Sequence, residues 1–75
     1  MSRIDSERLR GCLEYALRFD VAHDGSLYLN LLACVYLAAP DSAEPTLAHE
    51  FHLQAQAEQV NGDNVLNALL VEVPS

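Results

Sequence analysis

Hydrophobic residues dominate the middle of the chain. The stretch SLYLNLLACVYLAA, residues 26–39, contains no charged side chain. Its length and its leucine and alanine content predict a helix that is buried over most of its circumference. It is shorter than the roughly 20 apolar residues that a membrane-spanning helix needs. We therefore expect this helix to form the core, with the other segments packed around it.

The first segment, residues 2–19, is predicted to be an amphipathic helix. Its apolar side chains recur at intervals of three and four residues. They form one stripe, which consists of Leu9, Cys12, Leu13, Ala16 and Leu17. Ser2 followed by Asp5 has the spacing of a capping box, with aspartate in the glutamate position. We therefore expect this helix to begin close to Ser2.

The segment between these two helices leaves an alternative open. Asp24-Gly25 is a dipeptide typical of hairpin turns, and apolar residues alternate on both sides of it. A β-hairpin of residues 18–23 and 26–31 is compatible with this pattern. The uninterrupted apolar run that follows favours the helix, with Ser26 as its N-cap.

A third helix is predicted from Thr46 to Asn61-Gly62, a pair typical of helix C-termini, after Pro40 has ended the central helix. Its apolar residues fall on two nearly opposite faces, one with Leu47, Ala48, Phe51 and Ala55 and the other with Leu53, Ala57 and Val60. A helix with one core face needs only one of these. The second face is expected to be either packed within the domain or exposed for a partner.

The last segment is predicted to be a short fourth helix capped by Asp63. Its apolar arc consists of Val65, Leu66, Leu69, Leu70 and Val73. The final residues, LLVEVP, also fit a β-strand. We thus expect a single all-α domain over residues 1–75, with three to four short helices around residues 26–39. The alternative is an α+β fold with the hairpin at Asp24-Gly25.

Charge is distributed unevenly along the chain. All four arginines lie in the first eighteen residues, there is no lysine, and the formal net charge is −7. Residues 19–75 carry eight acidic side chains and no base. Direct nucleic-acid binding and attachment to an anionic membrane both depend on Lys and Arg, so this composition disfavours them. It fits a protein partner with a basic surface, although acidity also keeps a hydrophobic small protein soluble.

Few residues suggest a catalytic or metal-binding site. Cys12 and Cys34 are interpreted as buried reduced thiols, and the charged N-terminus has no apolar signal core, which predicts a cytoplasmic protein. His49 and His52 could share a metal ion, but a site needs a third ligand and the HExxH motif is absent. We therefore expect no metal, cofactor or catalytic site, and a non-enzymatic function.

Two functional hypotheses fit these features. The first is an inhibitor that masks a basic, nucleic-acid-binding surface of a larger partner, as small acidic inhibitors of bacterial or phage origin such as anti-CRISPR proteins do. This is an analogy of size and charge, without a shared motif. The predicted acidic contacts are Asp41, Glu44, Glu50, Glu58 and Asp63. The alternative is a chaperone or assembly subunit that binds a partner, or itself as a homodimer, through an apolar surface. That surface would consist of Leu53, Ala57, Val60 and a face shared by Tyr28 and Tyr36.

Overall fold

Four helices account for most of the described chain. The computed structural model describes residues 4–18 and 25–72, which contain α1 (Ser6–Arg18), α2 (Leu27–Ala38), α3 (Glu44–Ala57) and α4 (Gly62–Glu72). The predicted all-α class is confirmed. The hairpin alternative is wrong, because residues 27–31 belong to α2. Most of the first proposed hairpin strand, residues 19–23, lies outside the described residues.

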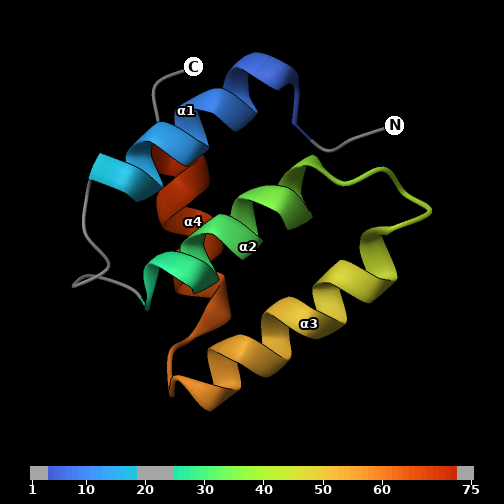
Figure 1. The fold of residues 1–75 in the computed structure, drawn as a ribbon, viewed down its shortest axis with the longest axis vertical. Helices are drawn as coiled ribbons and strands as arrows, with labels where there is room; N and C mark the ends of the chain where they lie inside the picture. The colour runs from blue at the N-terminus through green and yellow to red at the C-terminus, as the bar shows by residue number, and fades with distance from the viewer. Residues whose placement is uncertain (1–3, 19–24, 73–75) are drawn as a thin grey trace.

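The helices form two layers, as Figure 1 shows. α2 lies between α1 and α3 in one layer, and α4 crosses behind it in the other. α2 packs against all three other helices. The molecule is a thin slab that measures 30 × 26 × 16 Å along its principal axes. The predicted central position of α2 is therefore confirmed, and its side away from α4 is left uncovered by the described helices.

The core combines side chains from all four helices. The largest fully buried side chains are Phe51, Leu29, Leu69, Val65, Cys12 and Cys34. Full burial of a leucine, valine or phenylalanine side chain stabilises a fold by about 1.5–3 kcal/mol. The side of α2 that carries Leu29 and Cys34 therefore anchors the other three helices.

α1 begins later than the sequence pattern predicts. A side-chain oxygen of Asp5, Oδ1, accepts a hydrogen bond from the backbone N–H of Arg8 at 2.7 Å. The backbone oxygen of Asp5 accepts another from Leu9 at 2.9 Å. Asp5 is therefore the N-cap, and the predicted capping box that starts at Ser2 is wrong. Ser2 itself lies outside the described residues.

The predicted apolar stripe of α1 is confirmed except at its end. Cys12 and Ala16 are buried, and Leu9 and Leu13 are half-buried against the core. Leu17 is 65% exposed. The stripe therefore leaves the core before the helix ends.

α3 begins two residues before the predicted start and ends four residues before the predicted Asn61-Gly62 cap. Gln59 adopts a left-handed backbone conformation, with φ of 59°. The N–H of Gln59 bonds to the oxygen of Gln56 at 3.1 Å, and the N–H of Val60 bonds to the oxygen of Ala55 at 2.9 Å. These two bonds form a Schellman motif, which usually has glycine at the left-handed position.

Asn61 begins α4 instead of ending α3. Its side-chain oxygen accepts a hydrogen bond from the N–H of Asp63 at 2.9 Å. Its backbone oxygen accepts one from Val65 at 3.4 Å. Asn61 therefore occupies the N-cap position that was predicted for Asp63, which lies in the first turn.

The helical interpretation of the last segment is confirmed over its strand alternative. Val65 and Leu69 are fully buried, and Leu66 and Leu70 pack against the core. Val71 lies off this arc and is 78% exposed, as the helical pattern predicts. The last member of the predicted arc, residue 73, lies outside the described residues.

Candidate functional site

The five predicted acidic contacts occupy different environments. Asp41, Glu50 and Asp63 are exposed, whereas Glu44 and Glu58 are half-buried. Asp41 lies in the turn before α3, and Asp63 lies at the start of α4. No lysine or arginine occurs between residues 25 and 71, so these acids have no basic neighbour on their own helices.

The acids do not form a single row. α3 has 14 residues and is therefore about 21 Å long. Asp41 precedes its start and Asp63 follows its end, so these two lie toward opposite ends of the helix. Glu44 and Glu50 are six residues apart, which places them about 120° apart around the axis. The acids are thus spread over an acidic edge, which we define as α3 and its two flanking turns.

Glu58, which lies in the turn after α3 and thus on the acidic edge, also has a structural role. One carboxylate oxygen, Oε1, accepts a hydrogen bond from the backbone N–H of Ser26 at 2.7 Å. The other, Oε2, accepts from Ser26 Oγ at 2.6 Å and from Gln54 Nε2 at 2.7 Å. The bonds from Gln54 and Ser26 lower the pKa of the Glu58 carboxyl below its ordinary value. Glu58 therefore links the end of α3 to α2, and its contact with a partner stays a prediction.

This link extends into the N-terminal cap of α2. Ser26 Oγ accepts a hydrogen bond from the N–H of Leu29 at 3.1 Å, which confirms the predicted cap. The same hydroxyl donates to Glu58, so a carboxylate lies beside the N-terminus of α2. A negative charge at that end interacts favourably with the helix dipole. The cap and the carboxylate together fix the position of α2 on α3.

Gly25 is required by the same arrangement. Its φ is +87°, in the left-handed region that residues other than glycine rarely adopt. A Cβ atom there would lie 2.6 Å from Leu29 Cδ2 and 3.3 Å from Glu58 Oε1. The Asp24-Gly25 dipeptide therefore contributes a glycine that allows α2 and Glu58 to approach closely.

The predicted second apolar face of α3 is only partly exposed. Leu53 is 51% exposed, and Ala57 is exposed as well. Val60 is half-buried and packs against the core, because the chain turns at Gln59 and leaves the helix. An interpretation in which this whole face is sandwiched within the domain is wrong. Its exposed part is limited to Leu53 and Ala57.

The two tyrosines of α2 do not share a surface. Tyr28 is 59% exposed, whereas Tyr36 is only 8% exposed. The Tyr36 ring stacks on Phe51 with ring centroids 5.8 Å apart. Eight residues correspond to an offset of about 80° around a helix, which is enough to turn one ring outward and the other into the core. The predicted common face is therefore wrong for Tyr36.

An apolar surface on α2 was missed by the sequence interpretation. The α2 outward face consists of Leu27, Tyr28, Leu31, Leu32, Val35 and Ala38. Leu27, Tyr28 and Val35 are exposed and the other three are half-buried. These positions fall within an arc of about 140° on a helical wheel. A wheel of residues 26–39 would have grouped them, but it would not have shown that this arc is the one left uncovered.

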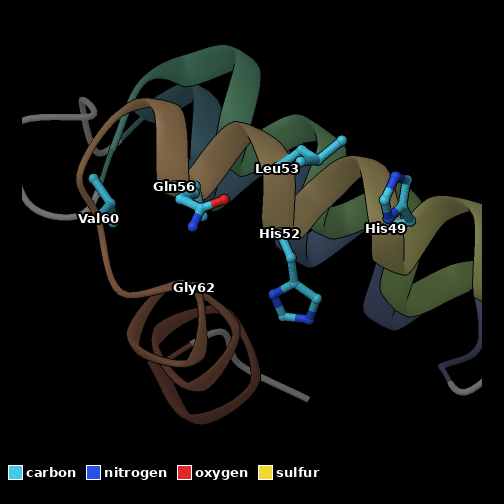
Figure 2. A pocket seen from close by; sticks show the side chains of 7 residues that line it. His49, His52, Leu53, Gln56, Val60 and Gly62 are labelled. Carbon is cyan, nitrogen blue, oxygen red and sulfur yellow. The ribbon is translucent and has the colours of Figure 1, made fainter.

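An open groove of about 350 Å³ lies between α3 and the start of α4. Figure 2 shows that the His49 and His52 rings, which line it, point in different directions. His52 instead packs edge-on against Phe51, with ring centroids 5.3 Å apart. Among residues 4–18 and 25–71, no three His, Cys, Asp or Glu side chains converge as metal ligands. This groove therefore gives the histidine pair no third ligand.

The two cysteines are free and buried, as predicted. The Cys12 thiol lies 3.8 Å from the backbone oxygen of Leu69, to which it donates, and it is hydrogen-bonded to Cys34. Burial raises the pKa of the Cys12 thiol, and burial together with the neighbouring Cys12 raises the pKa of Cys34 to about 12. Neither group is therefore a thiolate at neutral pH.

None of the helices in the described part of the chain has the length and apolar character required to cross a membrane. No protein-family model, curated protein or solved structure matches this chain.

Proposed function

We propose that the protein is a non-enzymatic binding module that masks a basic, nucleic-acid-binding surface of a larger protein. The observation that supports this most is the single sign of charge on three of its four helices. Residues 25–71 carry five acids and no lysine or arginine. With Glu58 bound to Ser26, the contact consists of Asp41, Glu44, Glu50 and Asp63. Such a surface attracts a basic partner and determines its orientation.

The spacing of these acids limits the kind of surface they can cover. The four carboxylates are spread along α3, which alone is about 21 Å long, and its two flanking turns, so they give no more than roughly one charge per 5 Å. Duplex DNA carries one charge per about 1.7 Å of its axis. The acidic edge therefore has about a third of the charge density of DNA. The acidic edge fits a partner groove that is lined by a few Arg or Lys side chains. The protein would block this groove without imitating a whole duplex.

The cellular setting belongs to the same proposal. Two reduced thiols are typical of proteins from reducing compartments, which supports a cytoplasmic location. A nucleic-acid-handling protein is a partner that would be met there. Under the inhibitor hypothesis, the reduced thiols and the acidic surface both fit a protein that meets its partner in the cytoplasm.

The experiment that tests the proposal compares two baits of equal net charge. Tagged Glu50→Lys and Glu14→Lys proteins each change the charge by two, and both residues are exposed in the middle of a helix. Glu50 lies on the acidic edge, whereas Glu14 lies on α1 among the arginines. We expect Glu50→Lys to reduce capture of the partner from a bacterial lysate about tenfold, equivalent to about 1.4 kcal/mol. Equal capture by both baits would contradict the proposal.

A second candidate function, that of a chaperone or assembly subunit, is supported by the exposed Leu53 and Ala57 on α3. A complex formed through these side chains would persist at high salt, because hydrophobic contacts are not screened. It would also be lost in Leu53→Asp and retained in Glu50→Lys. The two candidate functions therefore predict opposite results for the same pair of variants.

A further inference from the structure

We infer that Cys12 and Cys34 are a modification site, at which a small disulfide oxidant such as glutathione disulfide forms a reversible disulfide between α1 and α2. The inference goes beyond the proposed function, because it depends on the core and not on the acidic edge. The two residues are the only cysteines of the chain. Neither takes part in the proposed contact with a basic partner.

The two thiols are in direct contact inside the core. Cys12 lies on the apolar stripe of α1, Cys34 lies on the inward side of α2, and both side chains are fully buried. The thiols are hydrogen-bonded to each other, and Cys12 also donates to the backbone oxygen of Leu69. The thiol nearest to each cysteine is therefore the other cysteine, and the fold shields both from solvent.

The packing of α1 on α2 is compatible with a disulfide. Small side chains, Ala16 on α1 and Ala33 on α2, are buried in the same cluster as the cysteines. Cα atoms lie about 2.3 Å from a helix axis and packed axes are about 8–10 Å apart, so Cα atoms that face each other are roughly 3.5–5.5 Å apart. Cysteines joined by a disulfide usually have Cα atoms about 4.4–6.8 Å apart. The two sulfur atoms therefore need only a small movement to reach the bonded distance of about 2.05 Å.

The reaction consists of two successive thiol–disulfide exchanges. Burial raises the pKa of both thiols, so the first exchange takes place in a molecule that has opened locally and exposed one cysteine as a thiolate. That thiolate attacks one sulfur of glutathione disulfide, forms a mixed disulfide and releases one glutathione. The second cysteine then loses its proton and attacks the protein sulfur of the mixed disulfide, and the second glutathione leaves. The protein loses two protons and two electrons, and these convert glutathione disulfide into two glutathione thiols.

The fold should favour the internal disulfide over the mixed one. Glutathione attached to either sulfur does not fit a fully buried position, so α1 can close on α2 only after it has left. The internal disulfide closes a loop over residues 12–34 and thereby restricts the unfolded chain. By linkage, the fold stabilises the disulfide as much as the disulfide stabilises the fold. A reducing compartment keeps the pair as thiols, and an oxidising one joins α1 to α2.

A redox equilibrium of the full-length protein tests the inference. The protein is equilibrated without air at pH 8 with mixtures of reduced and oxidised glutathione, starting from either side, in buffer and in urea that unfolds it. Acid quenching and intact mass spectrometry then give the fractions of free thiols, mixed disulfide and internal disulfide. We expect the equilibrium constant for the internal disulfide to be about 100-fold larger in the folded protein. The oxidised protein should melt at least about 10 °C above the reduced protein.

Single-cysteine variants are the matched controls. Cys12→Ala and Cys34→Ala each keep one thiol and can form only the mixed disulfide. We expect this adduct to accumulate in urea and to be at least about tenfold rarer in buffer, because the remaining thiol is buried in the folded protein.

Three results would overturn the inference. One is an equilibrium constant for the internal disulfide that is equal or smaller in the folded protein than in urea. Another is a folded, unmodified protein that carries glutathione on one cysteine in place of the internal disulfide. The third is an oxidised protein that has lost its helical circular-dichroism signal or melts below the reduced protein. None of these results changes the capture of a basic partner, so the proposed function is tested separately.

Discussion

Replacing Glu58 by glutamine should destabilise the fold and weaken the attachment of α2 to α3. Glutamine keeps the length and shape of the side chain and removes the charge that accepts three hydrogen bonds from Ser26 and Gln54. The carboxamide keeps one oxygen acceptor. Its NH₂ group takes the place of the other carboxylate oxygen and cannot accept the hydrogen bonds that this oxygen accepts in the unmodified protein. The Ser26 cap of α2 should therefore lose its charged partner.

The size of this effect can be worked out from the contacts. A buried hydrogen bond to a charged group contributes about 1.5–3 kcal/mol, and loss of a helix N-cap costs about 1 kcal/mol. Glu58 is only half-buried, so solvent screens the site and the three bonds do not add in full. We expect a loss of about 1–2 kcal/mol in the free energy of unfolding at pH 7. For a domain of this length, that lowers Tm by roughly 4–16 °C.

The lowered pKa of Glu58 determines how the stability loss in Glu58→Gln changes with pH. The pKa of Glu58 is lowered in the folded protein from its ordinary value of 4.5. Its stabilising contribution is therefore complete above pH 4.5 and is lost as the pH falls through the lower, folded-state pKa. Below that pKa the carboxyl is protonated in both states. The stability difference between the unmodified protein and Glu58→Gln should accordingly be largest near neutral pH and shrink in acid.

Urea denaturation followed by circular dichroism measures this difference at pH 7 and in acid. Glu50→Gln is the control, because it removes one charge from an exposed position in the middle of α3, the helix that Glu58 follows. A double-mutant cycle with Ser26→Ala separates the coupling between the two side chains from their individual effects. Equal stability of Glu58→Gln and Glu50→Gln at pH 7, or a deficit that is unchanged in acid, would refute the reasoning.

Two further predictions concern the thiols and the apolar face of α3. Cys12 and Cys34 are both fully buried with raised pKa values, so a thiol reagent at pH 8 should label the native protein at least ~1,000-fold more slowly than the urea-unfolded protein. Rapid labelling of the native protein would show that the interior opens readily. Leu53→Asp should change Tm little because Leu53 is half exposed, whereas Val60→Asp should lower it markedly because Val60 packs against the core. Similar melting curves for the two aspartate variants would contradict this assignment of core and surface.

The sequence predicted α2 well because its signals are local. Ser26 lies directly before an uninterrupted apolar run, and Pro40 lies directly after it. The structure places the helix between them, with Ser26 as its cap. The periodic stripes of α1 and α4 were predicted for the same reason. In each case the decisive residues are separated by no more than a few positions.

The helix boundaries around residue 60 could not be predicted because asparagine and glycine serve both ends of a helix. Asn61-Gly62 has the composition of a C-cap, yet Asn61 caps the start of α4. The left-handed residue that ends α3 is Gln59, which has no strong preference for that conformation. Which helix the Asn61-Gly62 pair belongs to is decided by how α4 packs against the other three helices.

The role of Glu58 depends on a contact across 32 residues, and no spacing rule indicates it. From the sequence it was one of several acids without a basic neighbour. Tyr36 is a similar case, because its position beside Phe51 depends on how α2 is rotated against α3. The sequence thus indicated which residue types could lie on the surface. Whether each one is exposed depends on tertiary packing.

The most direct test of the proposed masking function is the salt dependence of partner capture. The tagged protein is immobilised, a bacterial lysate is applied at low ionic strength, and bound protein is eluted by stepwise increases in salt. The acidic edge predicts that a basic, nucleic-acid-handling protein elutes as the salt rises, because screening weakens contacts between exposed charges. A partner that remains bound at about 1 M salt, where the Debye length is about 3 Å, would contradict a charge-driven function.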